Sequence, residues 1–435
     1  KKKEQKETTI VWFRRDLRLT DNHGLYRALD ISKNVLPIFI FDIEILSQLE
    51  NKEDKRVDFI FQTLLTINQY LEKKGKSIKI FHGKPLEIFK KLANDYLIEN
   101  VFCNEDYEPS GIKRDGEIES FLTQKNIVFK QFKDQVHFHK DEILKSDGNP
   151  YSIYTPYSKQ WLLKYREQKV EIYPSEKHLQ NLINVEKQNV TLEQIGFKKT
   201  NYEFESPKLE ASILKTYHET RDFHTTKTSE MSVHLRFGTI SVRKLTFEAE
   251  KLNETYLKEL IWREFFMQIL YHFPKVINES FKRKYDNISW LYDEKNLKNW
   301  QEGKTGYPIV DAGMRQLNES GFMHNRVRMV CASFFTKHLL MDWRIGEAYF
   351  AEKLLDYDLS ANNGNWQWSA GTGCDSAPYF RVFNPEEQQK KFDPDFKYIK
   401  KWVKEFGKKD YPKPIVEHKF ARLRALETYK KGLQE

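Results

Sequence analysis

Residues 362–368 carry the densest group of potential ligand-binding side chains in the chain, Asn-Asn-Gly-Asn-Trp-Gln-Trp. The segments Ser-Ala-Gly-Thr-Gly at 369–373 and Tyr-Phe-Arg-Val-Phe-Asn-Pro at 379–385 follow it. Carboxamides can hydrogen-bond a heterocycle, indoles offer flat apolar faces, and glycines allow close approach. Because this mixture is poor material for a helix or a core, it predicts a pocket for planar aromatic ligands. The alternative is a tight loop with tryptophans buried for packing.

Two other segments place reactive side chains at helical spacing. Glu259, Trp262 and Arg263 stand at i, i+3 and i+4 within an apolar helical pattern that runs from residue 257 to residue 269. They therefore predict one helix face with a carboxylate, an indole and a guanidinium. Asn325 and Met329 lie one helical turn apart in the segment 321–329. The alternatives are that Glu259 pairs with Arg263 and that Met329 fills a core.

The elements that must position these residues change in type along the chain. Between residues 9 and 136, β-branched strands at 10–13, 35–41, 78–81 and 101–103 alternate with amphipathic segments such as 59–71, which predicts a parallel α/β domain. No GxGxxG follows the first strand, so the nicotinamide interpretation loses its main support. Instead residues 12–22 read Trp-Phe-Arg-Arg-Asp-Leu-Arg-Leu-Thr-Asp-Asn. The alternatives for them are a helix-capping loop and arginines that link two domains by salt bridges.

The second half of the chain is predicted to be helical. Periodicity fades between about residues 140 and 207, and a helical pattern begins near residue 208. We therefore predict an α/β plus all-α protein with a Rossmann-like antenna-type domain at 1–136, an interdomain connector at 137–207 and a helical domain at 208–435.

Composition limits the possible functions. The chain has 435 residues, 39% of them hydrophobic and 31% charged, with no apolar run of membrane-spanning length. Its three cysteines are far apart, which favours a reducing, cytoplasmic setting over a disulfide framework or a zinc site. The net charge of +9 favours a polyanionic partner, and the alternative is lysine spread evenly over the surface.

Five motifs resemble those of the DNA photolyase/cryptochrome family, in the family's order and approximate spacing. They are residues 12–22, 262–266, 300–308, 324–326 and the stretch around Trp366. The nearest pattern is that of class I cyclobutane pyrimidine dimer photolyases. The resemblance implies an FAD-containing deoxyribodipyrimidine photo-lyase, a carbon–carbon lyase. Such an enzyme uses blue light to pass an electron from reduced FAD to a dimer flipped out of damaged DNA.

The resemblance also implies roles for individual residues. The lesion pocket would contain Glu259, Trp262, Asn325, Met329 and Trp368, and electrons would reach the flavin through Trp290, Trp343 and Trp366. FAD would be held by Tyr217, Thr228, Ser229, Glu230, Met231, Ser232, Arg328, Asp356, Asp358 and Asn362, with Arg328 as the ion partner of Asp356. DNA would be bound by Arg221, Trp262, Arg263, Arg326 and Arg381. No metal ligand is implied.

Departures from the family pattern concern the antenna and the rival functions. Ser110-Gly111 and Val276-Ile277 stand where folate-binding members carry Asn-Glu and Cys-Lys, which argues against a folate and leaves a deazaflavin, another flavin or no antenna. The rivals are a cryptochrome-type signalling flavoprotein and a (6-4) photolyase. Asn325, where the (6-4) pattern has a histidine, favours dimer repair. We expect a monomer that needs no membrane and no obligate protein partner.

Overall fold

The computed structural model describes residues 6–223 and 228–434. The chain divides into two compact units, the first made of residues 1–142, 163–209 and 230–251 and the second of residues 143–162, 210–229 and 252–435. The predicted connector at 137–207 is thus shared between the units. A backbone bridge joins Leu182 to Val35 in the first unit, whereas the buried indole of Trp161 donates a hydrogen bond to Glu264 in the second.

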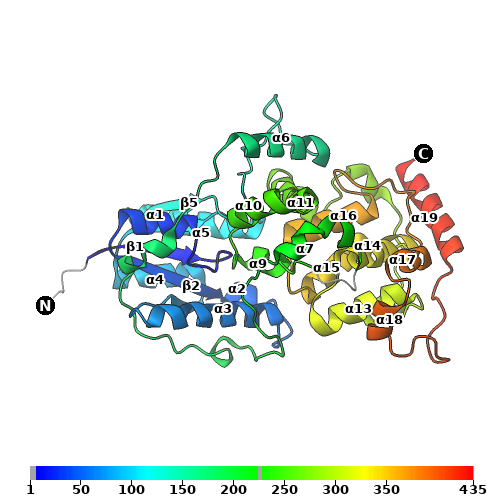
Figure 1. The fold of residues 1–435 in the computed structure, drawn as a ribbon, viewed down its shortest axis with the longest axis horizontal. Helices are drawn as coiled ribbons and strands as arrows, with labels where there is room; N and C mark the ends of the chain where they lie inside the picture. The colour runs from blue at the N-terminus through cyan, green and yellow to red at the C-terminus, as the bar shows by residue number, and fades with distance from the viewer. Residues whose placement is uncertain (1–5, 224–227, 435) are drawn as a thin grey trace. The chain divides into compact units, whose positions relative to one another are not determined.

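The first unit is built on a parallel five-stranded sheet (Figure 1). Its strands are β1 (Glu7–Phe13), β2 (Val35–Asp42), β3 (Lys79–Gly83), β4 (Leu97–Asn104) and β5 (Val128–Phe132), in the order β3-β2-β1-β4-β5. The predicted parallel α/β fold is confirmed. The pattern did not reveal β5, because this edge strand is partly exposed and its Val128 is 45% exposed.

Helices connect the strands and pack against the sheet to form the core. They are α1 (His23–Ile31), the short α2 (Ile43–Leu46), α3 (Lys55–Glu72), α4 (Pro85–Asp95) and α5 (Pro109–Gln124). Phe89 of α4 packs edge-on against Trp12 of β1, and Ile118 and Leu122 of α5 belong to the same apolar cluster. Asn22 caps α1 by accepting a hydrogen bond from the amide of Leu25, as one interpretation of residues 12–22 expected.

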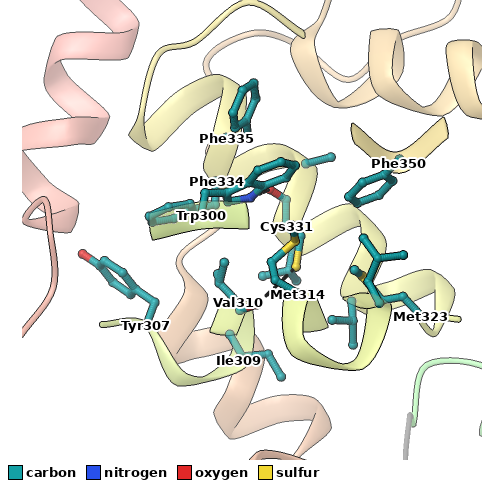
Figure 2. Packing of buried hydrophobic residues seen from close by; sticks show 14 of the residues in the cluster. Trp300, Tyr307, Ile309, Val310, Met314, Met323, Cys331, Phe334, Phe335 and Phe350 are labelled. Atoms are coloured by element: carbon teal, nitrogen blue, oxygen red, sulfur yellow. Dashed lines mark hydrogen bonds between the residues drawn. The ribbon is translucent and has the colours of Figure 1, made fainter. Parts of the chain in front are cut away.

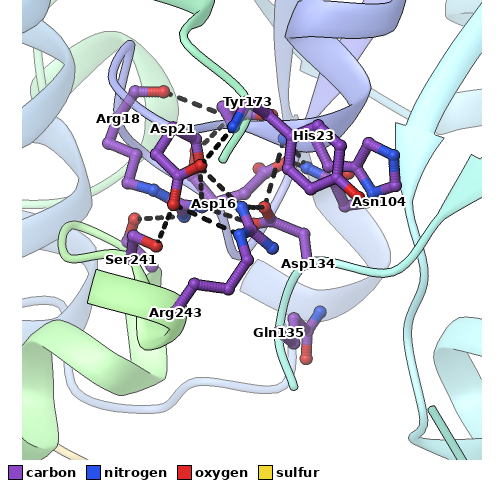
Figure 3. Close-up of polar contacts among 12 residues, drawn as sticks. Asp16, Arg18, Asp21, His23, Asn104, Asp134, Gln135, Tyr173, Ser241 and Arg243 are labelled. Carbon is purple, nitrogen blue, oxygen red and sulfur yellow. Dashed lines mark hydrogen bonds and ion pairs between the residues drawn. The ribbon is translucent and has the colours of Figure 1, made fainter. Parts of the chain in front are cut away.

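A buried polar network fixes the segment that follows β1 (Figure 3). Asp134 accepts hydrogen bonds from Arg18 at 2.8 and 2.9 Å and from Arg243 at 2.8 Å, and all three side chains are nearly inaccessible. Arg243 follows α9 (Ser232–Phe237) and lies in α10 (Val242–Leu252). Its Nε also contacts Asp21. These ion pairs are internal to the first unit, where they stabilise the fold of residues 16–21.

The second unit packs helices around an aromatic core (Figure 2). Trp300 is fully buried there, its ring lies 4.5 Å from Phe335, and its indole N–H donates to the carbonyl of Cys331. The helices are α6 (Tyr154–Glu167), α7 (Ala211–Lys215), α8 (Tyr217–Thr220), α11 (Glu254–His272), α12 (Glu294–Glu302), α13 (Pro308–Ser320), α14 (Asn325–Ser333), α15 (Trp343–Lys353), α16 (Leu359–Ala370), α17 (Pro385–Phe392), α18 (Lys397–Trp402) and α19 (His418–Leu433). Residues 154–162 of α6 belong to this unit and the rest of α6 to the first.

The expectation that residues 362–368 are poor helix material is wrong, because they form the middle of α16. Asp358 caps the helix by accepting from Ser360, and Gly371 ends it at a positive φ of 86°. Gly364 leaves room for the ring of Phe266, because a Cβ at position 364 would lie 2.2 Å from that ring. Carbonyls outside the helix accept hydrogen bonds from the side-chain amides of Asn362, Asn363 and Gln367, so tertiary packing overrides weak helix propensity.

Among the described residues, no helix is long and apolar enough to cross a lipid bilayer.

Candidate functional site

The helix α16 is the centre of the site because it packs against α11, α14 and α15. These four helices carry most of the residues that the sequence singled out for the lesion pocket and the electron route. The separate motifs at 259–266, 324–329, 343 and 362–368 are thus brought together in one unit.

On α11, Glu259 and Trp262 are partly buried and each has a defined partner. Oε1 of Glu259 lies 3.2 Å from Nη1 of Arg221, whereas the sequence offered Arg263 as the alternative partner. Burial raises the pKa of Glu259, Asp222 adds to this rise, and Arg221 opposes it. The indole of Trp262 stacks on Tyr154 with ring centres 3.7 Å apart and planes 3° apart, which fixes its orientation.

The N-terminal turn of α14 presents the amide and thioether. Asn325 is exposed, and its Nδ2 lies 4.0 Å from the sulfur of Met329 one turn later. His324 caps the helix by accepting from the amide of Arg326. The predicted proximity of Asn325 and Met329 is confirmed, and Met329 is partly exposed rather than buried in the core.

The predicted ion pair between Arg328 and Asp356 is present. Nη1 and Nη2 of Arg328 donate to the two carboxylate oxygens of Asp356 at 3.2 and 2.9 Å, and its Nε donates to the carbonyl of Met323. Asp356 and Asp358 are both buried. The two carboxylates therefore directly precede α16, and Asp358 acts as its helix cap.

Asn362 contacts a carboxyl-bearing turn of α15 that the sequence reading missed. Its Nδ2 donates to the backbone carbonyl of Glu347, and Nδ2 of Asn363 donates to the side chain of Glu347 at 3.0 Å. Burial raises the pKa of Glu347 to about 8, which the Asn363 hydrogen bond and Arg344 only partly offset. The Glu347 carboxyl group, which lies beside Asn362 and Asn363, therefore has a pKa well above its usual range.

The segment proposed for the FAD phosphates crosses the boundary between the two units. In the second unit, the hydroxyl of Tyr256 donates to Ser229, and its ring packs edge-on against Tyr217. In the first, Met231 is buried and Glu230 has a left-handed φ of 55°. Thr228 and Ser232 complete the five-residue stretch, Thr228 being partly exposed and Ser232 exposed.

The three tryptophans proposed for electron supply belong to the aromatic core. Trp343 and Trp366 are almost fully buried, and Trp290 packs against the same cluster and against Tyr429. Within the described part of the chain, the indole N–H groups of Trp343 and Trp366 have no hydrogen-bond partner. Trp300, which the sequence reading did not assign, lies 6.0 Å from the ring of Trp366.

The arginines proposed for DNA binding differ in their surroundings. Arg221 pairs with Glu259, and Arg326 pairs with Asp222 at 2.9 Å while stacking over Phe392. Arg263 is partly buried on α11, and Arg381 is exposed. Asp222 was missed, although its position directly after Arg221 in the sequence could have indicated it.

The fold and this site define a flavoprotein of the photolyase/cryptochrome class, and comparisons with known proteins agree. The family model described as DNA photolyase matches residues 9–175, and the one described as FAD binding domain of DNA photolyase matches residues 256–408. The chain belongs to the DNA photolyase family. The FAD prediction is thereby confirmed.

Individual relatives are similar over nearly the whole chain. The deoxyribodipyrimidine photo-lyase of Alkalihalophilus pseudofirmus is 35% identical over 97% of this chain and 97% of its own length. A class III photolyase from Agrobacterium tumefaciens is 31% identical, covers 100% of this chain and 99% of its own and superposes with a TM-score of 0.86. An archaeal photolyase from Sulfolobus tokodaii, solved with two FAD molecules, is 34% identical, covers 98% and 100%, and has a TM-score of 0.83. The predicted enzyme class, deoxyribodipyrimidine photo-lyase, is confirmed.

The side chains present in the second unit fit an FAD. They offer hydroxyl groups at Tyr256 and Ser229, buried carboxylates at Asp356 and Asp358, and the amide of Asn362. Such groups can bind phosphate, ribityl hydroxyls and a flavin ring, respectively.

Gly111 bears on the identity of a second chromophore. It lies in α5, and a Cβ at this position would be 2.3 Å from the carboxylate of Asp106. The glutamate of folate-binding members therefore does not fit here unless Asp106 moves.

Proposed function

We propose that this enzyme repairs cyclobutane pyrimidine dimers in DNA under blue light. The observation that carries this proposal is the arrangement of Glu259, Trp262, Asn325 and Met329 on two helices that pack against α16. The relatives named deoxyribodipyrimidine photo-lyase support it. The class I assignment remains part of the proposal.

In this proposal each residue has a defined task. FAD, when bound, supplies a photoexcitable electron donor. Trp262 offers an aromatic face to a flipped pyrimidine. Burial raises the pKa of Glu259, which favours sharing of a proton between its carboxyl group and a pyrimidine carbonyl that gains negative charge. Asn325 binds the polar base edge, and Met329 packs against the apolar part of the dimer.

DNA binding is proposed for the basic residues around these helices. Arg221, Arg326 and Arg381 bind phosphates, and Trp262 and Arg263 also contact the DNA. Trp290, Trp343 and Trp366 supply electrons that keep the flavin reduced, and the predicted flavin contacts of Tyr217, residues 228–232, Arg328, Asp356, Asp358 and Asn362 hold the cofactor.

The test is to illuminate the reduced holoenzyme with an oligonucleotide that contains a single thymine dimer and to measure restored thymines by chromatography. The proposal predicts light-dependent restoration with no action on a (6-4) photoproduct. Repair of the (6-4) photoproduct alone would establish the rival repair activity. Absence of any repair by FAD-loaded protein would favour a signalling flavoprotein.

We further propose that any second chromophore is a flavin or deazaflavin rather than a folate. The geometry at Gly111 and the second FAD in the Sulfolobus tokodaii photolyase support this. Extraction of the purified protein, with chromatography and absorption spectra of the released chromophores, tests it; a stoichiometric folate would contradict it.

We also propose that the enzyme acts as a cytoplasmic monomer. Light scattering of the purified holoenzyme tests the oligomeric state, and fractionation of the source cells tests the compartment.

A further inference from the structure

Four charged side chains of the second unit form a row of alternating sign. Glu259 contacts Arg221 at 3.2 Å, Asp222 lies 4.0 Å from Arg221, and Asp222 contacts Arg326 at 2.9 Å. Asp222 uses Oδ2 toward Arg221 and Oδ1 toward Arg326. Its carboxylate is therefore placed between two arginines, one of which reaches the proposed lesion pocket through Glu259.

We propose that Asp222 is a specificity-determining residue that couples occupation of the lesion pocket to the phosphate contact of Arg326. This inference rests on the proposed function. When a dimer engages Glu259, Arg221 loses its partner and pairs fully with Asp222. A bidentate pair with Arg221 occupies Oδ1 as well as Oδ2 of Asp222, so Asp222 releases Arg326, which is free to bind a DNA phosphate. Arg221 thus changes its ion-pair partner within the row, whereas Arg326 contacts the DNA.

The exposure of these groups makes such an exchange of partners inexpensive. The side chains of Arg221, Glu259 and Asp222 are 39%, 35% and 32% exposed, and half-exposed ion pairs contribute little to stability. Burial also raises the pKa of Glu259, whereas the charge of Arg221 acts to lower it.

Of the four charged residues in the row, Arg326 is the best positioned to bind a phosphate. It is only 18% exposed, and its guanidinium lies over the ring of Phe392 with 4.6 Å to the ring centre. Its orientation is therefore fixed in advance, while Asp222 competes with phosphate for Nε and Nη2. On undamaged DNA, Glu259 keeps Arg221 and Asp222 keeps Arg326, so the phosphate contact is weak. The arrangement selects damaged DNA.

The first test compares Asp222→Asn with the matched control Asp286→Asn in DNA-binding titrations at several salt concentrations. Asp286 pairs with Arg344 at 2.8 Å and is 28% exposed, so the control removes the same charge from a similar ion pair. For undamaged DNA, Asp222→Asn should raise affinity several-fold and steepen the salt dependence by about 0.9, the value for one added phosphate contact. For dimer-containing DNA it should change little, so that the ratio of the two affinities falls. The control should leave the ratio unchanged.

The second test does not depend on the Asp222 variant being folded. Glu259→Gln imitates the occupied pocket by removing the charge that holds Arg221. On undamaged DNA it should steepen the salt dependence by about 0.9 in the wild-type background and leave it unchanged in the Arg326→Ala background. An equal increase in both backgrounds would show that Arg221 is freed locally, and it would overturn the coupling.

The outcomes separate this inference from the proposed function. If the wild-type enzyme does not prefer dimer-containing DNA, the proposed function fails. If it does prefer such DNA but Asp222→Asn strengthens binding to both DNAs equally, only the coupling fails. Circular dichroism and the flavin absorbance of each variant establish that it is folded and loaded.

Discussion

Asp134 in the first unit and Asp222 in the second each lie between two arginines, but they differ in exposure. Asp134 is 1% exposed and hydrogen-bonds Arg18 and Arg243, whereas Asp222 is 32% exposed and shares Arg221 and Arg326. Burial makes the first arrangement permanent, because separating these charges would leave one of them unpaired in a low-dielectric interior. Exposure to solvent allows the charges around Asp222 to exchange partners. Contacts between aspartate and arginine thus stabilise the fold in one unit and, as we propose, contribute to DNA recognition in the other.

The largest effect that this comparison predicts is on stability. Asp134→Asn should lower the free energy of unfolding by about 3–5 kcal/mol, because Arg18 and Arg243 lose their shared counter-charge while remaining buried. Chemical denaturation followed by circular dichroism measures this change. Asp286→Asn, which breaks a half-exposed pair, should cost at most about 1 kcal/mol. Equal losses in the two variants would remove burial as the cause of the difference.

A carboxyl group that is hydrogen-bonded to a neutral amide instead of an arginine sharpens the comparison. Arginines hold the pKa of Asp134 well below its usual value despite burial, whereas burial raises that of Glu347, which hydrogen-bonds the neutral Asn363, to about 8. A raised pKa stabilises the fold fully below the unfolded value near 4.3, and this contribution is lost as the pH rises toward 8. Glu347→Gln cannot titrate, so its stability relative to wild type should rise by roughly 3–4 kcal/mol between pH 5 and pH 8.

Denaturation of both proteins at pH 5 and pH 8 checks the Glu347 prediction. A difference between the two proteins that does not depend on pH would show that Glu347 is already ionised at pH 5.

The buried tryptophans should affect flavin reduction more than folding. Trp343→Phe keeps an apolar ring in the core, so the cost in stability should stay below about 1.5 kcal/mol. Photoreduction of oxidised flavin by an external thiol should slow strongly, since phenylalanine is much harder to oxidise. Enzyme reduced beforehand with dithionite should repair dimers nearly as well as wild type.

Trp300→Phe serves as the comparison for Trp343→Phe, because the ring of Trp300 lies 6.0 Å from that of Trp366. Slow photoreduction in Trp300→Phe and not in Trp343→Phe would redirect the electron route through Trp300. Loss of repair by the pre-reduced Trp343 variant would mean that this residue supports the lesion pocket.

The smallest predicted effect concerns one phosphate contact. Arg326→Ala should weaken binding to dimer-containing DNA and reduce the slope of its salt dependence by about 0.9. On undamaged DNA the slope should change little, because Asp222 holds Arg326 there. Titrations at several salt concentrations measure both slopes. An unaltered slope on damaged DNA would assign Arg326 to the structure instead of the interface.

Much of the fold and part of the site could be predicted from the sequence. Strand periodicity predicted the parallel sheet except for its exposed edge strand β5, and helical spacing predicted the common face of Glu259 and Trp262. The helix α16 could not be predicted, because its formation depends on the contact of Gly364 with Phe266 and on carbonyls distant in the sequence. The sequence did not identify Asp222 and Glu347 as site residues for a similar reason, because their partners Arg326 and Asn363 come from other elements.

The central claim is that the half-buried charges of the second unit act on the lesion and do not hold the fold. It is tested most directly by the number of thymines restored per absorbed photon by pre-reduced wild type and Glu259→Ala on dimer-containing DNA. We predict that the variant keeps its FAD and its unfolding midpoint but loses most of the repair yield, because the carboxyl group stabilises charge on the dimer. An unchanged yield in the variant would contradict the account.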